Sequence, residues 1–270
     1  MDSVLVTGGT GLLGRRVARA LAADGHPVRI LSRSPASPPV PGAEVTVADL
    51  STGVGLSDAV AGASAVVHCA TDPRNSRAVD VEGTERLLEA ARDAGRPHLV
   101  SVSIVGIDRI PVTYYRAKLA AEQAVVRSGL PWTVLRTTQF HGFVEELLGR
   151  LVRLPVVPVP RGWRLQPIDV EEVARRLADA VAAEPAGRLP DLGGPEVFPV
   201  AELVRDRLRR TGRHRPVVEV PLPGALCAAL RAGANLVPGN PAGGRTWREF
   251  LDSRPQHRSQ HRLQHRLGAR

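Results

Sequence analysis

Short apolar runs alternate with amphipathic stretches along the first half of the chain. Each run is only a few residues long and is bounded by Gly, Pro, Ser or Asp, a pattern that predicts strands. Between the runs, apolar residues recur at helical spacing, as over residues 17–22 and 87–91. The predicted strands cover 4–6, 27–31, 44–48, 65–70, 98–103 and 132–136.

The regular alternation of strand and helix predicts an α/β fold, a doubly wound parallel sheet of the Rossmann type. The run at 65–70 has almost no polar interruption, as expected for a parallel strand buried on both faces. His68 lies inside this run, and we interpret it as a hydrogen-bonded core residue rather than a catalytic one.

The rest of the chain is predicted to add a small C-terminal lobe on the substrate side. We expect residues 1–253 to form a single Rossmann domain, with the lobe built mainly from 137–168 and 190–253. Residues 254–270 are basic and are predicted to be a disordered tail. His257, His261 and His265 would align on a helix there, but no acid or cysteine lies nearby, so we predict no metal site.

The net charge of +9 raises the question of a nucleic-acid partner, but the excess is concentrated in the tail. Residues 254–270 hold five arginines and no acid, and removing these five charges leaves +4 for the rest. Aromatic residues make up only 3% of the chain, so no basic stripe with interleaved aromatics is present. Nucleic acid is therefore not an expected partner.

Composition and the start of the chain favour a cytoplasmic protein without membrane association. No apolar run approaches the ~20 residues of a membrane span. The chain enters a strand within its first few residues, which leaves no room for a signal peptide. Its two cysteines, Cys69 and Cys227, cannot build a disulfide framework.

A glycine-rich turn joins the first strand to the first helix. Gly8 would let the chain turn sharply, Gly11 would let backbone N–H groups approach a pyrophosphate, and Gly14 would let the helix pack closely on the sheet. The helix N-terminus adds unpaired donors and a partial positive charge. The predicted dinucleotide contacts in this turn are Gly8, Thr10, Gly11, Leu12, Leu13 and Gly14.

The end of the second strand favours NADP(H) over NAD(H). An acid there would bind the adenosine ribose and repel a 2′-phosphate, but the chain has Arg33 between two serines. A solvated loop arginine is the alternative interpretation of Arg33. Further cofactor contacts are expected from Asp49 and Leu50 beside the adenine, and from Cys69 and Ala70 at the end of the fourth strand.

Lys118 is the only lysine among 36 basic residues, which indicates that arginine cannot replace it. Tyr114 precedes it by four residues, so both side chains share one helix face. A neighbouring cation lowers the pKa of a tyrosine from its usual value near 10, so we expect Lys118 to activate Tyr114 as an acid or base. Tyr115 competes with Tyr114 for this role. A surface helix with an aromatic start is the alternative.

Together these motifs resemble the atypical short-chain dehydrogenase/reductases, and more narrowly their NmrA-like, NAD(P)-binding branch. The resemblance implies that Tyr114 is the general acid/base and that Lys118 binds the nicotinamide ribose. It also implies that Ser103 orients the substrate carbonyl, with Ser101 as a second candidate. It covers about residues 3–235 and rests on segments 7–14, 49–50, 80–84, 103, 114–118, 135–140, 166–173 and 193–196.

Phe140, His141 and Phe143 follow the sixth strand and are expected to face the substrate. They indicate an apolar or aromatic substrate, unless the phenylalanines only attach their helix to the sheet. The predicted protein is an NADP(H)-dependent oxidoreductase of a small carbonyl, enone or quinone-like substrate, as a monomer or homodimer. A redox sensor that binds NADP(H) without turnover is one alternative. A sugar-nucleotide epimerase or dehydratase is another.

Overall fold

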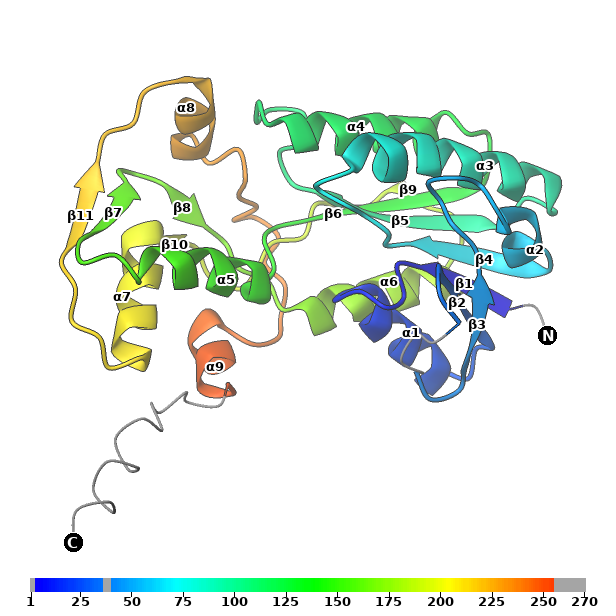
Figure 1. The fold of residues 1–270 in the computed structure, drawn as a ribbon, viewed down its shortest axis with the longest axis horizontal. Helices are drawn as coiled ribbons and strands as arrows, with labels where there is room; N and C mark the ends of the chain where they lie inside the picture. The colour runs from blue at the N-terminus through cyan, green and yellow to red at the C-terminus, as the bar shows by residue number, and fades with distance from the viewer. Residues whose placement is uncertain (1–2, 36–39, 255–270) are drawn as a thin grey trace, which may run out of the picture.

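A seven-stranded parallel sheet forms the centre of the computed structural model, which describes residues 3–35 and 40–254 (Figure 1). The strand order is β3-β2-β1-β4-β5-β6-β9. The connection reverses direction between β1 and β4, the switch point at which such sheets bind ligands. The strands are β1 (Ser3–Thr7), β2 (Val28–Ser32), β3 (Ala43–Val47), β4 (Ala63–His68), β5 (His98–Ile104), β6 (Trp132–Thr137) and β9 (Gly187–Arg188).

Helices cover both faces of this sheet because its central strands are apolar on both sides. Val4 and Val6 of β1 point to one face, under α1 (Gly14–Ala23) and α6 (Val170–Ala182). Leu5 points to the other face, and this side is covered by α2 (Leu56–Val60), α3 (Gly83–Asp93) and α4 (Thr113–Val126). Figure 1 shows α3 and α4 above the sheet and α1 and α6 below it.

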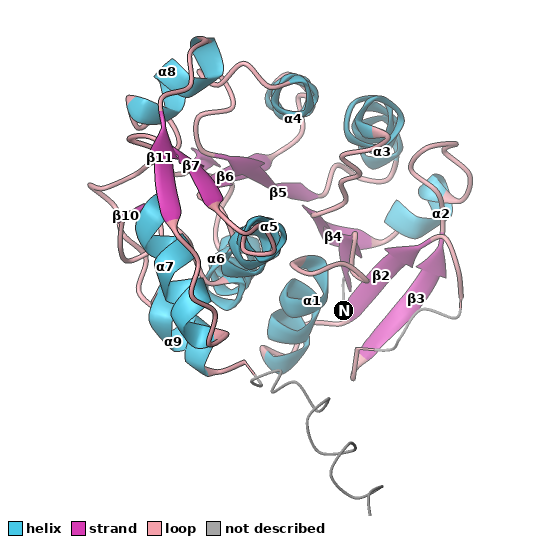
Figure 2. Cartoon of the chain, turned by 60° about the vertical axis from the view of Figure 1, so that its left-hand side comes forward, coloured by secondary structure: helices cyan, strands magenta, loops and turns pink. Residues whose placement is uncertain are grey.

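A second lobe lies beside the carboxyl end of the sheet and has its own apolar core. Its buried residues come from 144–159 and 198–251, within the segments assigned to the lobe from the sequence. Two short sheets support it, and Figure 2 shows β7 and β11 side by side next to α5 and α7. Its elements are α5 (His141–Leu151), β7 (Val157–Pro160), β8 (Arg164–Leu165), β10 (Phe198–Pro199), α7 (Val200–Arg210), β11 (Val217–Val220), α8 (Ala225–Arg231) and α9 (Trp247–Asp252).

The doubly wound parallel fold predicted from the sequence is confirmed. All six predicted strands are present, and the structure adds β9, which is too short to show a periodicity. A six-residue π-helix, η1 (Arg77–Glu82), precedes α3. The prediction for residues 254–270, with the three tail histidines, falls outside the described residues except at Arg254. No helix of the described chain is long and apolar enough to cross a membrane.

We expect Trp247→Ala to destabilise the protein strongly. Trp247 is 1% exposed in the lobe core, so truncation leaves a large cavity and costs ~3–5 kcal/mol of unfolding free energy. Urea unfolding followed by circular dichroism measures this loss. Leu222→Ala, at a residue that is 39% exposed, is the control and should change the unfolding free energy by less than ~0.5 kcal/mol. Equal effects of the two substitutions would contradict the described lobe core.

Candidate active site

A cavity of about 1130 Å³ opens at the carboxyl end of the sheet, between the Rossmann layers and the lobe. It exceeds the roughly 300–1,000 Å³ of most small-ligand pockets, so an extended ligand fits it. Its walls come from the loops that follow β1, β2, β3 and β4, from the ends of β5 and β6, and from α4 and α5. Every residue that the sequence assigned to the dinucleotide, from Gly8 to Lys118, lines this cavity.

The glycine turn approaches the end of β4 so closely that side chains are excluded. Gly8 has φ +65°, and a Cβ there would lie 2.7 Å from the backbone nitrogen of Ala70. A Cβ on Gly14 would collide with the carbonyl oxygen of Gly8. Gly14 therefore allows the first turn of α1 to pack on the glycine turn itself, rather than on the sheet as we had expected. The bare backbone beside the start of α1 fits a pyrophosphate.

After the end of β2 the cavity wall presents one exposed cation. Arg33 is exposed, lines the cavity and makes no ion pair with any residue in 3–35 or 40–254. Asp49 also lines it, but its Oδ1 accepts hydrogen bonds from the Ser51 backbone N–H (2.8 Å) and the Ser51 hydroxyl (2.7 Å). The charge of Asp49 is therefore partly satisfied within its own loop.

Tyr114 and Lys118 both line the cavity, and a third group connects them. The Tyr114 hydroxyl lies 2.7 Å from Thr71 Oγ1, and Thr71 Oγ1 donates to Asp80 Oδ1 at 2.6 Å. Lys118 Nζ lies 3.6 Å from the same carboxylate oxygen. Asp80 is 1% exposed and belongs to η1. The buried carboxylate thus balances the ammonium and is tied to the tyrosine through a threonine.

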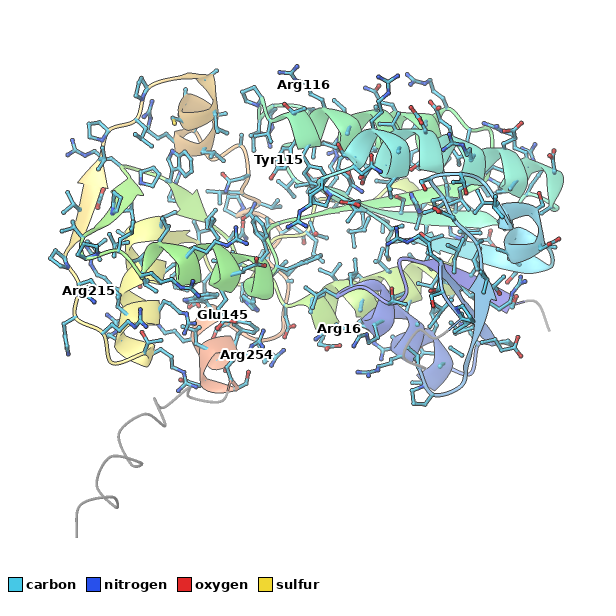
Figure 3. All side chains as sticks on the ribbon, in the orientation of Figure 1. Arg16, Tyr115, Arg116, Glu145, Arg215 and Arg254 are labelled. Carbon is cyan, nitrogen blue, oxygen red and sulfur yellow. The ribbon has the colours of Figure 1, made fainter. Side chains whose placement is uncertain are left out.

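The prediction that Lys118 lowers the pKa of Tyr114 is wrong. Burial raises the pKa of Tyr114 to about 12, and the negative charge of Asp80 adds to the rise. The charge of Lys118, which is paired with Asp80, does not lower the pKa of Tyr114. Tyr114 is therefore a neutral hydroxyl that carries its proton. Tyr115, which also lines the cavity, has its pKa raised by burial as well (Figure 3).

Ser103 lies in the cavity wall, but its hydroxyl donates to Glu122 Oε2 at 2.5 Å. Glu122 also pairs with the buried guanidinium of Arg136, which reaches Asp108 at 3.0 Å. Since the single proton of Ser103 is used by Glu122, this arrangement does not let Ser103 donate to a substrate carbonyl. Ser101, the second candidate, does not line the cavity.

Of the three residues expected at the substrate, Phe140 and Phe143 line the cavity and His141 does not. Phe140 packs partly against the sheet core, whereas Phe143 is 57% exposed, so only Phe140 attaches its helix to the sheet. The expectation for His141 is wrong because its side chain turns into the lobe core. Its ring lies 4.9 Å from Phe250, and burial lowers its pKa to about 4.

The interpretation of His68 as a core histidine is confirmed. Its two ring nitrogens lie 2.7 Å from Thr7 Oγ1 and 3.0 Å from Thr84 Oγ1, and burial lowers its pKa to about 3. Cys69 lines the cavity as a neutral thiol, since burial raises its pKa to about 12. In the described part of the chain, no three His, Cys, Asp or Glu residues are grouped as a metal site.

Two polar residues of this wall, Thr71 and Gln139, were not predicted from the sequence. Thr71 lies three residues after the end of β4, a position that indicates proximity to the cavity but not a hydrogen bond to Tyr114. Gln139 lines the cavity with its Oε1 buried and without a hydrogen-bond partner among the described residues. In the sequence, Asp80 is only one member of the 80–84 motif. The structure shows that its carboxylate is buried and pairs with Lys118.

Comparison with known proteins places this arrangement in a family. The family model for NAD(P)H-binding proteins matches residues 8–183, which include the glycine turn, Tyr114 and Lys118. Among curated relatives, a (4-alkanoyl-5-oxo-2,5-dihydrofuran-3-yl)methyl phosphate reductase of Streptomyces griseus is 34% identical over 227 residues. The match covers 78% of this chain and 74% of that protein.

A second relative, the chloroplastic protein High Chlorophyll Fluorescence Phenotype 244 of Arabidopsis thaliana, is 30% identical over 235 residues. The match covers 82% of this chain but only 58% of that longer protein. Among solved structures, the NADPH complex of the Escherichia coli quinone oxidoreductase QOR2 has the same fold, with a TM-score of 0.77 and 17% identity. The alignment covers 92% of this chain and 98% of that one. The chain therefore belongs to the NAD(P)H-binding family.

Proposed function

We propose that this protein is an NADP(H)-dependent reductase of a small, uncharged carbonyl, enone or quinone-like substrate. One observation carries the proposal: the proton-bearing hydroxyl of Tyr114 and the paired ammonium of Lys118 share one cavity with the glycine turn. This combination provides a place for a dinucleotide and an acid beside it. A protein that only stored a nucleotide would have no need for the acid.

Residues at different places along the cavity have different roles in this proposal. The glycine turn and the start of α1 would hold the pyrophosphate, and Lys118 would bind the nicotinamide ribose. When bound, the reduced nicotinamide supplies a hydride to the substrate. Tyr114 then gives its hydroxyl proton to the substrate oxygen, a step that general acids typically accelerate by ~10²–10⁴-fold.

The chemistry of the cavity wall supports an uncharged substrate. Arg33 and Lys118 are the only cations among the described residues that line it, and both are assigned to the cofactor. The wall also contains the apolar or aromatic side chains of Ile104, Tyr115 and Phe143. A sugar nucleotide would need a second cluster of cations for its diphosphate. An epimerase or dehydratase of such substrates is therefore disfavoured.

A second candidate function, a redox sensor that binds NADP(H) without turnover, is favoured by the state of Tyr114. A phenol with its pKa raised to about 12 is a weak acid, and its proton is already engaged by Thr71. Such a group can complete a binding site without reacting. The two candidates differ in one measurable property, the oxidation of NADPH in the presence of a substrate.

We expect Tyr114→Phe to lower kcat by ~10²-fold or more, because the acid is removed while the ring remains. NADPH oxidation is measured against a panel of ketones, enones and quinones, with cofactor affinity measured separately by fluorescence. Tyr115→Phe is the matched control and should keep most of the turnover. Turnover unaffected by Tyr114→Phe refutes the catalytic role. Tight NADPH binding with no turnover on any panel member would support the sensor.

Arg33→Ala should weaken NADPH binding by ~10-fold, because a charge-assisted contact with the 2′-phosphate is lost. NADH lacks this phosphate, so its affinity should stay the same. Isothermal titration with both cofactors checks the difference. Arg19→Ala, at an exposed arginine of α1 outside the cavity wall, should change neither affinity. An equal loss for NADH and NADPH in Arg33→Ala would rule out a 2′-phosphate contact.

A further inference from the structure

Three exposed apolar side chains lie at the edge of the cavity and along α5. They are Leu12, Phe143 and Leu147, with exposed fractions of 49%, 57% and 44%. We propose that this group, which we call the α5 strip, binds an alkyl or prenyl chain of the substrate outside the cavity. The substrate would then be an uncharged carbonyl or quinone-like compound with a long apolar substituent. The proposal rests on the proposed reductase function and names its substrate class.

The α5 strip is continuous with the cavity that contains Tyr114. Leu12 on the glycine turn and Phe143 on α5 both line the cavity, whereas Leu147 does not. Leu147 follows Phe143 by four residues, so the two share one face of α5 and lie about 6 Å apart along its axis. An alkyl chain attached to a reacting group in the cavity can therefore pass Leu12 and Phe143 and reach Leu147.

The packing of the lobe does not account for these exposed side chains. The core side of α5 is formed by Val144 and Leu148, which are both 0% exposed. Phe143 and Leu147 each precede one of these core residues, which places them about 100° further around the helix. Two large apolar side chains are thus left in water one turn apart, and covering them is favourable.

Gly142 leaves open space between α5 and the glycine turn. Apart from its own helix and chain neighbours, a Cβ on Gly142 would meet one heavy atom within 4 Å, which is Leu12 Cδ2 at 3.9 Å. Glycine is among the least favourable residues inside a helix, so helix stability does not explain its presence here. The missing side chain leaves room beside Leu12, where the alkyl chain would leave the cavity.

The charges of α5 favour an uncharged ligand over an anionic lipid. Arg150 is the only Lys or Arg of α5, and it pairs with Glu146 at 2.6 Å. Glu145 pairs with Arg207 at 3.5 Å and with Arg254 at 3.4 Å (Figure 3). The headgroup of a fatty acid or an acidic phospholipid would therefore meet no uncompensated cation on this helix.

The size of the α5 strip suits one alkyl chain rather than a protein partner. A stable protein interface takes roughly 800 Å² and roughly 20–30 residues from each side. Three side chains supply only a small part of that area. A single alkyl chain needs no more than such a strip.

The first test measures binding without turnover. Alkyl phenyl ketones with methyl, butyl and octyl chains are titrated into the NADP⁺ complex by calorimetry. Affinity should rise by ~2–4-fold per methylene while the added methylenes still contact the strip. Leu147→Ser should lower octyl ketone affinity by ~10-fold and leave methyl ketone affinity unchanged, because Leu147 lies outside the cavity wall. Val126→Ser, at an equally exposed residue (44%) at the end of α4, is the control and should change neither affinity.

The second test fills the open space beside Leu12. Gly142→Leu should remove most of the octyl gain and keep methyl ketone affinity, because the new side chain occupies the room that the alkyl chain needs. NADPH oxidation is then followed with the same ketones and with naphthoquinones that carry the same chains. Wild-type kcat/KM should rise with chain length, and Leu147→Ser should flatten that rise.

The outcomes separate the α5 strip from the proposed function. Equal affinity for methyl and octyl ketones overturns the strip, and turnover that is independent of chain length retains the reductase. An octyl gain that survives both Leu147→Ser and Gly142→Leu also overturns it, because the alkyl chain then binds elsewhere. A wild-type dimer that Leu147→Ser dissociates in sedimentation velocity assigns the strip to a second copy instead. Binding that rises with chain length without NADPH oxidation of any compound retains the strip and contradicts the reductase.

Discussion

The contact between the glycine turn and the end of β4 is the constraint on which the rest of the site depends. The backbone N–H of Ala70 donates to Thr7 Oγ1 at 3.2 Å, and Gly8 lies so close to Ala70 that no side chain fits between them. This contact joins β1 and β4 at the point where the sheet reverses its connection, and so forms the floor of the cavity. It also fixes where the chain leaves β4. The next residue, Thr71, is thereby held 2.7 Å from the Tyr114 hydroxyl, so one contact positions both the glycine turn and the threonine that links Tyr114 to Asp80.

Charge is distributed unevenly along the cavity. At the reacting end, the ammonium of Lys118 is matched by Asp80, and the buried Arg136 behind Ser103 is matched by Glu122. Buried charges are costly unless they are paired, and each of these two cations has an acid partner. Arg33, after β2, is instead exposed and makes no ion pair with any residue in 3–35 or 40–254. The two cations that line the cavity therefore differ: one is paired with a buried acid and one is available to a ligand.

Much of this could be predicted from the sequence, for identifiable reasons. Strands and helices have different apolar periods, and three glycines at fixed spacing leave few alternatives to a dinucleotide turn. The single lysine among so many arginines also indicates a position where arginine cannot replace it. The sign of the Tyr114 pKa shift could not be predicted, because an i,i+4 spacing reveals a shared helix face but neither the burial of Tyr114, which is the main cause of the rise, nor the acid that meets the cation. Asp80 lies 38 positions before Lys118, and only the packing of η1 under α4 brings them together. The burial of the His141 ring could not be predicted for the same reason: the aromatic residues that it contacts come from α9, far along the chain.

The stacking of His141 on Phe250 has a consequence for the order in which the molecule forms during synthesis. The helix that carries Phe143 into the cavity begins at His141, and α9, which covers that start, is the last helix of the described chain. The strands and turns that hold the dinucleotide are complete far earlier, and segments made first generally fold first. During synthesis, the segments that hold the dinucleotide are therefore complete before α9, which packs against the start of α5. The start of α5, from which Phe143 reaches the cavity wall, is fully packed only once α9 has been made.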